Sequence, residues 1–200
     1  MRLLALLGAA SLVPAGPVQI GTGPAGGTVW QVVIPNPAAP LDLRPTVFYL
    51  PPGLTAGRRY RVVFFLHGFP GSPYQFVDGL RLAETADTGV TSGRLRPFVA
   101  VVPPAGFDVR HGEWSGLWED YLVRDVVPWA DARLLRSLGT RFFLSCGTTR
   151  DRATARDTRA FSRELRSLGL PHELWLAPGG HDGSLWRRQL PAALLFALRR

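Results

Sequence analysis

The sequence predicts an α/β fold, a three-layer sandwich in which helices cover both faces of a mostly parallel sheet. Segments with strand patterns alternate along the chain with segments of helical period, which is the order of elements in such domains. The clearest strand, residues 61–66 (R-V-V-F-F-L), is a continuous β-branched and aromatic run, as in strands buried on both faces. It ends abruptly in H-G-F-P-G-S-P, a loop rich in glycine and proline. Such a loop exposes backbone N–H groups at the carboxyl end of a strand, where open α/β sheets bind ligands.

Length and composition favour one domain with a sizeable core, because the chain has 200 residues, of which 46% are hydrophobic. The formal net charge is +8, and every basic residue is arginine. An anionic partner such as nucleic acid or an acidic envelope surface would explain this charge. A GC-rich coding bias also explains it, together with the many Ala, Gly and Pro residues. We favour the bias and expect no nucleic-acid partner, because the arginines are scattered along the sequence and no basic and aromatic face stands out.

The first residues resemble a secretory signal. Arg2 precedes a short apolar stretch at residues 3–13, and small residues follow it as a cleavage site. The stretch is too short to span a bilayer comfortably, and the alternative is the remnant of a membrane anchor. We therefore predict residues 1–15 to be a signal peptide or anchor remnant, residues 16–27 a linker rich in Gly and Pro, and residues 28–200 a single domain. The protein is expected to be secreted or held at the cell envelope.

Strand and helix patterns follow each other through the domain in an order that fits the predicted fold. Strands are expected at residues 28–35, 44–50, 59–66, 97–102, 141–146 and 172–176. Helices are expected at residues 76–86, 118–135, 158–168 and 184–198. The second helix carries an apolar stripe with a residue every three or four positions: Trp118, Leu122, Val126 and Trp129. Pro128 predicts a kink or a break in that helix.

Motifs of one enzyme superfamily, the α/β-hydrolases, occur in their usual order: L-H-G-F-P-G-S-P, W-E-D-Y-L-V-R-D-V-V-P-W-A-D, F-F-L-S-C-G-T-T-R-D and P-G-G-H-D-G-S-L-W. They extend roughly from residue 44 to the C-terminus. On these motifs the chain resembles an esterase family that includes esterase D, feruloyl and acetylxylan esterases, enterochelin esterases and the mycolyltransferases. The resemblance implies an α/β-hydrolase-like sandwich that acts on carboxylic esters by hydrolysis or acyl transfer.

The resemblance also implies roles for individual residues. His181 in G-G-H-D lies after the last strand, where the family places its catalytic base. Asp151 follows the fifth predicted strand and would orient that base; its other interpretation is a cap for the next helix. Asp157 is an alternative for both roles. The backbone N–H groups of Gly68 and Phe69 would form the oxyanion hole, to which the next residue, a proline without an N–H, cannot contribute.

The nucleophile of this chemistry is missing from the sequence. In α/β-hydrolases it is the serine of a G-x-S-x-G elbow between a strand and a helix, and no such motif occurs in this chain. Other hydroxyl and thiol groups have the wrong neighbours or the wrong position: Ser72, Ser115, Ser145, Cys146 and Ser184. Residues 133–140 lead straight from the V-V-P-W helix to the strand that follows the elbow region in relatives. The central strand and the elbow helix are therefore expected to be absent, and the nucleophile is unknown.

Loss of a central strand would leave two sheet edges that either pair with each other or stay open. Direct pairing of residues 94–102 with residues 141–146 would give a narrower sheet. It would also shift the predicted base and acid relative to the oxyanion loop.

We expect a serine esterase or acyltransferase acting on carboxylic esters, impaired or inactive because its serine is missing. The alternatives are a non-catalytic remnant or binding module of the same fold, and a reading frame that has lost the elbow by deletion. Expected partners are small-molecule or cell-envelope esters, and the N-terminal segment is a candidate for membrane or envelope association. No cofactor or metal is expected, because no His, Cys and Asp cluster has ligand spacing. The sequence gives no indication of the oligomeric state.

Overall fold

The computed structural model describes residues 16–37, 44–56, 58–67, 71–105, 117–134, 141–149, 152–167, 169, 171–180 and 183–198. Its strands are β1 (Val18–Thr22), β2 (Thr28–Val32), β3 (Thr46–Leu50), β4 (Arg61–Phe64), β5 (Phe98–Val102), β6 (Phe142–Gly147) and β7 (His172–Ala177). Its helices are η1 (Gln75–Gly79), α2 (Leu82–Thr91), α3 (Leu117–Tyr121), η2 (Leu122–Val126), α4 (Val127–Leu134), α5 (Arg152–Ser167) and α6 (Gly183–Leu198). The predicted strands and helices are present with shifted ends, and the helix expected at residues 76–86 is divided into η1 and α2.

A five-stranded sheet forms the larger part of the fold, in the order β1-β2-β3-β5-β4. β1, β2, β3 and β5 pair antiparallel, and β5 pairs parallel with β4, so this sheet is mixed rather than mostly parallel. Every residue of β3 and β5 is buried, because both strands have a neighbouring strand on each side and helices on each face. These two strands form the centre of the core.

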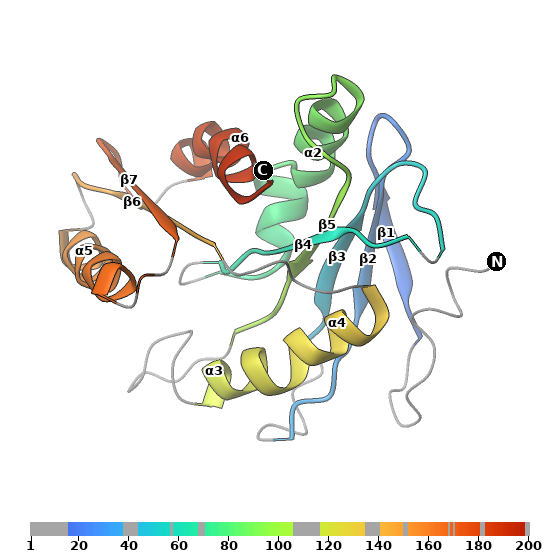
Figure 1. Cartoon of the computed structure of the whole chain (residues 1–200), viewed down its shortest axis with the longest axis horizontal. Coiled ribbons are helices and arrows are strands. Elements are labelled where there is room, and N and C mark those ends of the chain that lie inside the picture. The colour runs from blue at the N-terminus through green and yellow to red at the C-terminus, as the bar shows by residue number, and fades with distance from the viewer. Residues whose placement is uncertain are drawn as a thin grey trace.

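Helices cover both faces of the large sheet, which confirms the predicted three-layer α/β architecture. Figure 1 shows α2 and α6 on one side of it and the α3–η2–α4 segment on the other. On the first side Leu194 of α6 packs in one cluster with Phe98. On the second side Val126 packs in another cluster with Phe48, as the predicted apolar stripe requires. Pro128 is two residues beyond Val126, the end of the π-helical turn η2, so the expected irregularity lies just before the proline.

A second, two-stranded parallel sheet contains β6 and β7. It has α5 on one face and α6 on the other, and Figure 1 shows it beside the large sheet rather than within it. The pairing considered between residues 94–102 and 141–146 is wrong, because β5 lies between β3 and β4 in the large sheet. Within the described residues the large sheet ends at β4 and the small sheet begins at β6, so the two edges have stayed open.

The segment predicted to be a linker, residues 16–27, belongs to the domain instead, because it contains β1 and the turn to β2. A buried carboxylate holds this turn. Asp87 of α2 accepts hydrogen bonds from the N–H groups of Ala25 (2.8 Å) and Gly27 (3.1 Å) and from the hydroxyl of Tyr49 (2.8 Å). A Cβ atom on Gly23 or Gly27 would overlap the Asp87 carboxylate, so glycine is required there for close approach. Two of the glycines that made this segment resemble a linker, Gly23 and Gly27, are therefore packing residues.

Candidate active site

The C-terminal end of helix α6 is hydrogen-bonded to residues at or just before the start of one strand from each sheet. The Arg61 guanidinium at the start of β4 donates to the Leu198 carbonyl (2.7 Å), and the Arg141 guanidinium just before β6 donates to the Phe196 carbonyl (3.4 Å). Cations at the last carbonyls of a helix are favourable, because those groups have no partners within the helix. Both strands therefore start beside the C-terminal end of α6.

The far ends of β4 and β6 lead toward the beginning of α6. Ser145, near the end of β6, is hydrogen-bonded to Gln189 of α6, so β6 runs antiparallel to that helix. The Arg187 side chain donates to the Gly79 carbonyl (3.0 Å) at the end of η1, the helix that follows the loop after β4. The region at the start of α6 is thus where the loops after β4, β6 and β7 are directed.

The loop after β4 is described up to His67 and again from Gly71. His67 is buried, with 4% of its surface exposed, and directly precedes the predicted oxyanion residues. Gly68 and Phe69 themselves lie outside the described residues. Beyond them the chain turns tightly into η1, with the Gln75 N–H bonded to the Ser72 carbonyl (3.1 Å).

The segments after β6 and β7 are joined by a hydrogen-bonded contact, which we call the Thr149–Gly179 clamp. The Thr149 N–H donates to the Gly179 carbonyl (2.9 Å), and the Gly179 N–H donates to the Thr149 hydroxyl (3.1 Å). One step earlier, the Thr148 N–H donates to the Ala177 carbonyl (3.0 Å). These contacts continue the β6–β7 pairing beyond the last paired residues, Gly147 and Ala177.

The close approach of these two segments depends on glycine. A Cβ atom on Gly147 would overlap the carbonyl oxygens of Gly179 and Gly180. Gly179 has a φ of 147°, a conformation that side chains disfavour. The C-G-T-T and P-G-G-H stretches therefore use their glycines to hold two loop backbones together.

The predicted acid and base, Asp151 and His181, lie outside the described residues. Each is two residues beyond the clamp, Asp151 after Thr149 and His181 after Gly179. Asp157 lies inside α5, which begins at Arg152, so the prediction that it competes to cap this helix is wrong.

The alternative nucleophiles occupy different surroundings. Cys146 has a buried thiol with 3% exposure, which is in no disulfide and whose Sγ contacts the Gly147 carbonyl (3.2 Å). Ser145 is hydrogen-bonded to Gln189 of α6. Ser184 is exposed in the first turn of α6, Ser72 is half-buried before η1, and Ser115 lies outside the described residues.

A hydroxyl does contact an imidazole elsewhere in the described part of the chain. The Ser162 hydroxyl of α5 lies 3.0 Å from Nε2 of His172 on β7, a contact that no sequence pattern indicated. Ser162 has only 2% of its surface exposed and is covered by the small sheet. A nucleophile must reach its substrate, so this pair joins α5 to β7 and does not form a catalytic site.

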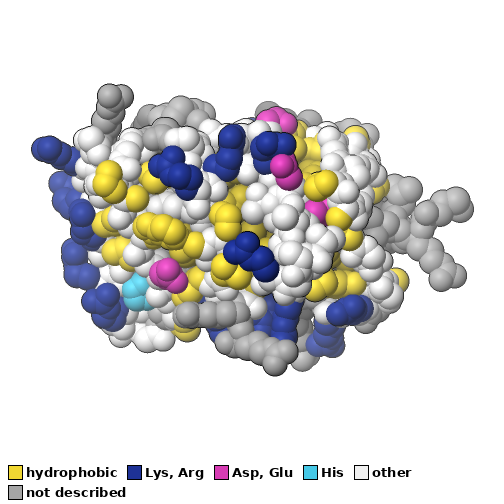
Figure 2. All heavy atoms as spheres, turned by 90° about the horizontal axis from the view of Figure 1, so that it is seen from above, with side chains coloured by type: hydrophobic (Ala, Val, Ile, Leu, Met, Phe, Trp, Pro, Cys, Tyr) yellow, Lys and Arg dark blue, Asp and Glu magenta, His cyan; other side chains and the backbone are white. Residues whose placement is uncertain are grey.

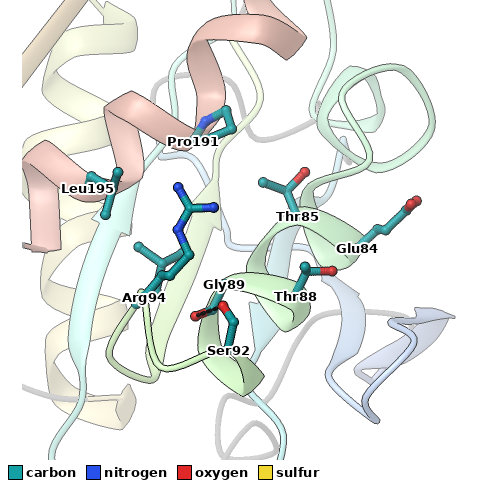
Figure 3. A pocket seen from close by; sticks show the side chains of 9 residues that line it. Glu84, Thr85, Thr88, Gly89, Ser92, Arg94, Pro191 and Leu195 are labelled. Atoms are coloured by element: carbon teal, nitrogen blue, oxygen red, sulfur yellow. Dashed lines mark hydrogen bonds between the residues drawn. The ribbon is translucent and has the colours of Figure 1, made fainter.

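A hollow of about 270 Å³ lies between α2 and α6, as Figure 3 shows. Its lining residues are Glu84, Thr85, Thr88, Gly89, Ser92, Arg94, Leu95, Pro191 and Leu195. Pro191 and Leu195 belong to the second half of α6, so the hollow is away from the loops that follow β6 and β7.

Among the residues described here, no group of three His, Cys, Asp or Glu side chains could hold a metal ion, and no helix is long and apolar enough to cross a membrane.

Comparison with known proteins agrees with this architecture. A family model described as "Putative esterase" matches residues 42–141, half of the chain. A ferulic acid esterase is similar in structure, with a TM-score of 0.65 and 16% identity over 92% of this chain and 98% of its own. A ferulic acid esterase from Anaeromyces mucronatus, solved with ferulic acid, has a TM-score of 0.61 and 12% identity over 84% and 90% of the two chains. The fluorophosphonate-binding serine hydrolase F of Staphylococcus aureus has a TM-score of 0.56 and 10% identity over 94% and 100%.

These matches confirm the resemblance and the fold class read from the sequence. At such low identity the structural matches establish the fold, and the family match establishes the kind of enzyme to which the chain is related. The chain belongs to this esterase family of carboxylic ester hydrolases and has a shortened α/β-hydrolase-like fold.

Proposed function

We propose that this chain is an esterase-type α/β-hydrolase for carboxylic esters whose covalent step is impaired because the nucleophilic serine is missing. One observation carries the proposal: only seven residues separate Leu134, the end of α4, from Phe142, the start of β6. A nucleophile elbow needs a strand, a tight turn and a helix. An average strand has about 5 to 6 residues and an average helix about 11 to 12, so seven residues cannot provide both.

The break between the two sheets supports the same proposal. The large sheet ends at β4, which precedes the oxyanion loop, and the small sheet begins at β6, which precedes the acid. In the relatives that the motifs resemble, the strand and helix carrying the serine come between these two parts. The chain has therefore kept the elements on either side of the elbow.

The remaining site would contain an acid–base pair and an oxyanion hole. Asp151 would accept a hydrogen bond from the His181 imidazole and hold the ring in one tautomer. The Thr149–Gly179 clamp supports this pairing, because it keeps the two loop backbones together just before both residues. The N–H groups of Gly68 and Phe69 would bind the ester carbonyl oxygen. Without a positioned hydroxyl, no acyl-enzyme would form.

The substrates would be small-molecule or cell-envelope esters. Esters of ferulic acid are the first to test, because they are the substrates named for two structural relatives. Residues 1–15 would direct the protein to secretion or to the envelope and would not belong to the folded domain. The second candidate function, a binding module that holds esters without cleaving them, is favoured by the same missing serine.

The test is hydrolysis of p-nitrophenyl acetate and methyl ferulate by the wild type and by His181→Ala, with ligand binding measured in parallel by calorimetry. Asp78→Asn serves as the control, since Asp78 is an exposed acid of η1. We expect wild type, variant and control to hydrolyse both esters equally slowly. Saturable binding without turnover would favour the binding module. A wild-type rate about 100-fold above that of His181→Ala would show a working general base and would contradict the impairment.

A further inference from the structure

Helix α5 carries a row of arginines that the linear sequence does not make obvious. Their spacing alternates between four and three residues: Arg152, Arg156, Arg159, Arg163 and Arg166. At 100° per residue, this spacing places all of them within an arc of about 80° on the helix surface. All five are exposed. They form a straight row about 21 Å long, since a helix rises 1.5 Å per residue, and we call it the arginine ridge.

By helical register, no acidic residue of α5 falls on the ridge. Ala155, Ser162 and Leu165 are buried against the small sheet and fix the inward face of the helix. The two acids of the helix, Asp157 and Glu164, fall at register positions roughly 120° or more from the centre of the ridge. Figure 2 shows basic side chains gathered along the end of the molecule where α5 lies in Figure 1.

The arginines of α5 are therefore not scattered, as they seem to be when read along the chain. The intervening residues separate them in sequence, and the helical period brings them together. A coding bias explains why these residues are arginine rather than lysine. It does not explain why they share one flank of an exposed helix.

We propose that the arginine ridge is a docking surface for an anionic phospholipid membrane. The charge is complementary to phosphate headgroups, and a plane can touch a straight, narrow row of guanidinium groups at every point along its length. Ala155 and Leu165 of α5 are covered by β6 and β7, and the partly exposed Phe161 falls on the side of the helix opposite the ridge, so docking would be peripheral and electrostatic rather than insertive. Single-stranded nucleic acid fits less well, because such sites pair basic groups with a groove and stacked aromatic rings.

The position of the ridge gives docking a consequence. It starts at Arg152, the residue after the predicted acid, and three residues after Thr149 of the clamp. A membrane bound to the ridge would therefore lie near Thr149 and the loops that follow β6 and β7. The proposal stands on charge and geometry alone and does not depend on ester cleavage.

The experiment is co-sedimentation of the full chain with vesicles of equal parts phosphatidylglycerol and phosphatidylcholine, at about 0.1 M NaCl. The ridge variant is Arg159→Gln/Arg163→Gln/Arg166→Gln. Its matched control is Arg58→Gln/Arg94→Gln/Arg96→Gln, which loses the same charge from exposed arginines outside α5. Because each arginine near an anionic surface changes partitioning about fivefold, we expect the ridge variant to bind about 100-fold more weakly and the control less than about fivefold more weakly.

Further measurements distinguish docking through the ridge from attraction by net charge and from nucleic-acid binding. The ridge variant with lysine in place of glutamine keeps its charge and should bind like the wild type. Equal losses in the ridge and control variants would reduce the effect to net charge and overturn the proposal. Equal binding to vesicles of phosphatidylcholine alone would also overturn it. Tighter, ridge-dependent binding to duplex DNA or to an oligonucleotide than to the anionic vesicles would assign the surface to nucleic acid instead.

Discussion

The central strands of the large sheet, β3 and β5, and the strands of the small sheet, β6 and β7, are all rich in apolar residues but are buried to very different degrees. All residues of β3 and β5 are buried, whereas the first four residues of β6 are half-buried and β7 alternates between exposed and half-buried positions. The difference comes from the neighbours. β3 and β5 have strands on both sides, whereas β6 and β7 have only each other among the described strands. An apolar run thus shows that a strand suits burial on both faces, and its neighbours decide whether that burial is achieved.

The open edges have the composition of central strands. Val62, Val63 and Phe64 lie on β4, and Phe142 and Phe143 lie on β6. Edge strands usually carry charges, prolines or bulges that prevent further pairing, and beyond Arg61 at the start of β4 these two strands provide none of those protections. The composition of β4 and β6 is thus that of interior strands. Under the proposed function, the segment that would have carried the nucleophile belongs between them.

The largest effect is expected at Asp87, which fixes the β1–β2 turn to α2 in the large sheet. Asp87→Asn should lower the free energy of unfolding by about 3 kcal/mol, because it weakens several buried hydrogen bonds to a charged group. Urea denaturation measures this. Glu84→Gln on the same helix is the control, since Glu84 is partly exposed in a surface ion pair with Arg81 and should change stability by less than about 0.5 kcal/mol. Equal losses of unfolding free energy in Asp87→Asn and Glu84→Gln would show that the Asp87 hydrogen bonds have no special role.

The hydrogen bond between Ser162 of α5 and His172 of the small sheet should contribute less to the free energy of unfolding than the Asp87 hydrogen bonds do. Ser162→Ala removes one neutral hydrogen bond to His172 and should cost about 1 kcal/mol in the same denaturation experiment. Amide hydrogen exchange should also be faster in β6 and β7 than in β3 and β5. A cost for Ser162→Ala as large as that for Asp87→Asn would contradict the difference between the sheets.

Alkaline pH should destabilise the large sheet through Tyr49. Burial, together with the hydrogen bond to Asp87 and the charge of its carboxylate, raises the pKa of Tyr49 well above its ordinary value. In the unfolded chain Tyr49 ionises near pH 10, while in the folded protein it stays protonated. The unfolded state then binds fewer protons, so stability present below about pH 10 is lost as the pH rises above it, by up to about 1.4 kcal/mol per pH unit.

The variant Tyr49→Phe isolates this effect, because phenylalanine cannot ionise. The free energy of unfolding, measured between about pH 9 and pH 11, should fall more steeply for the wild type than for Tyr49→Phe. The region from β6 to the C-terminus contains no tyrosine, so this sensitivity belongs to the large sheet. Parallel curves for the two proteins would exclude Tyr49 as its source.

The smallest effect concerns the clamp between the loops after β6 and β7. Thr149→Val removes the hydroxyl that accepts the Gly179 N–H, whereas Thr149→Ser keeps it. If the clamp positions Asp151 against His181, solvent exchange of the His181 ring N–H, measured by NMR, should become about fivefold faster in Thr149→Val, as loss of about 1 kcal/mol implies. Thr149→Ser should match the wild type.

Two controls separate the clamp from the pair itself. Asp151→Ala should abolish the slow exchange of the ring N–H. No change in Asp151→Ala would remove the proposed acid–base pair. A change in Asp151→Ala without one in Thr149→Val would keep the pair and remove the role of the clamp.

Sequence patterns predicted the alternation of strands and helices and the family, because these depend on local period and motif order. The missing elbow stays a prediction. Sequence patterns missed β1, since glycines needed for contact with Asp87 have the same composition as a linker. They also missed the arginine ridge, which exists only once residues 152–166 adopt a helical period. The separation of the sheets could not be predicted, because the apolar residues of β4 and β6 suit a paired strand and gave no sign that these strands end their sheets.

The central claim is that the chain kept the surroundings of an esterase site and lost its nucleophile. Labelling with a fluorophosphonate probe, followed by intact-mass measurement, tests it most directly, with the Staphylococcus aureus fluorophosphonate-binding serine hydrolase F as the positive control. We predict no stoichiometric adduct on this chain. One adduct per molecule, located on a serine and lost in His181→Ala, would contradict the account and show a complete catalytic site.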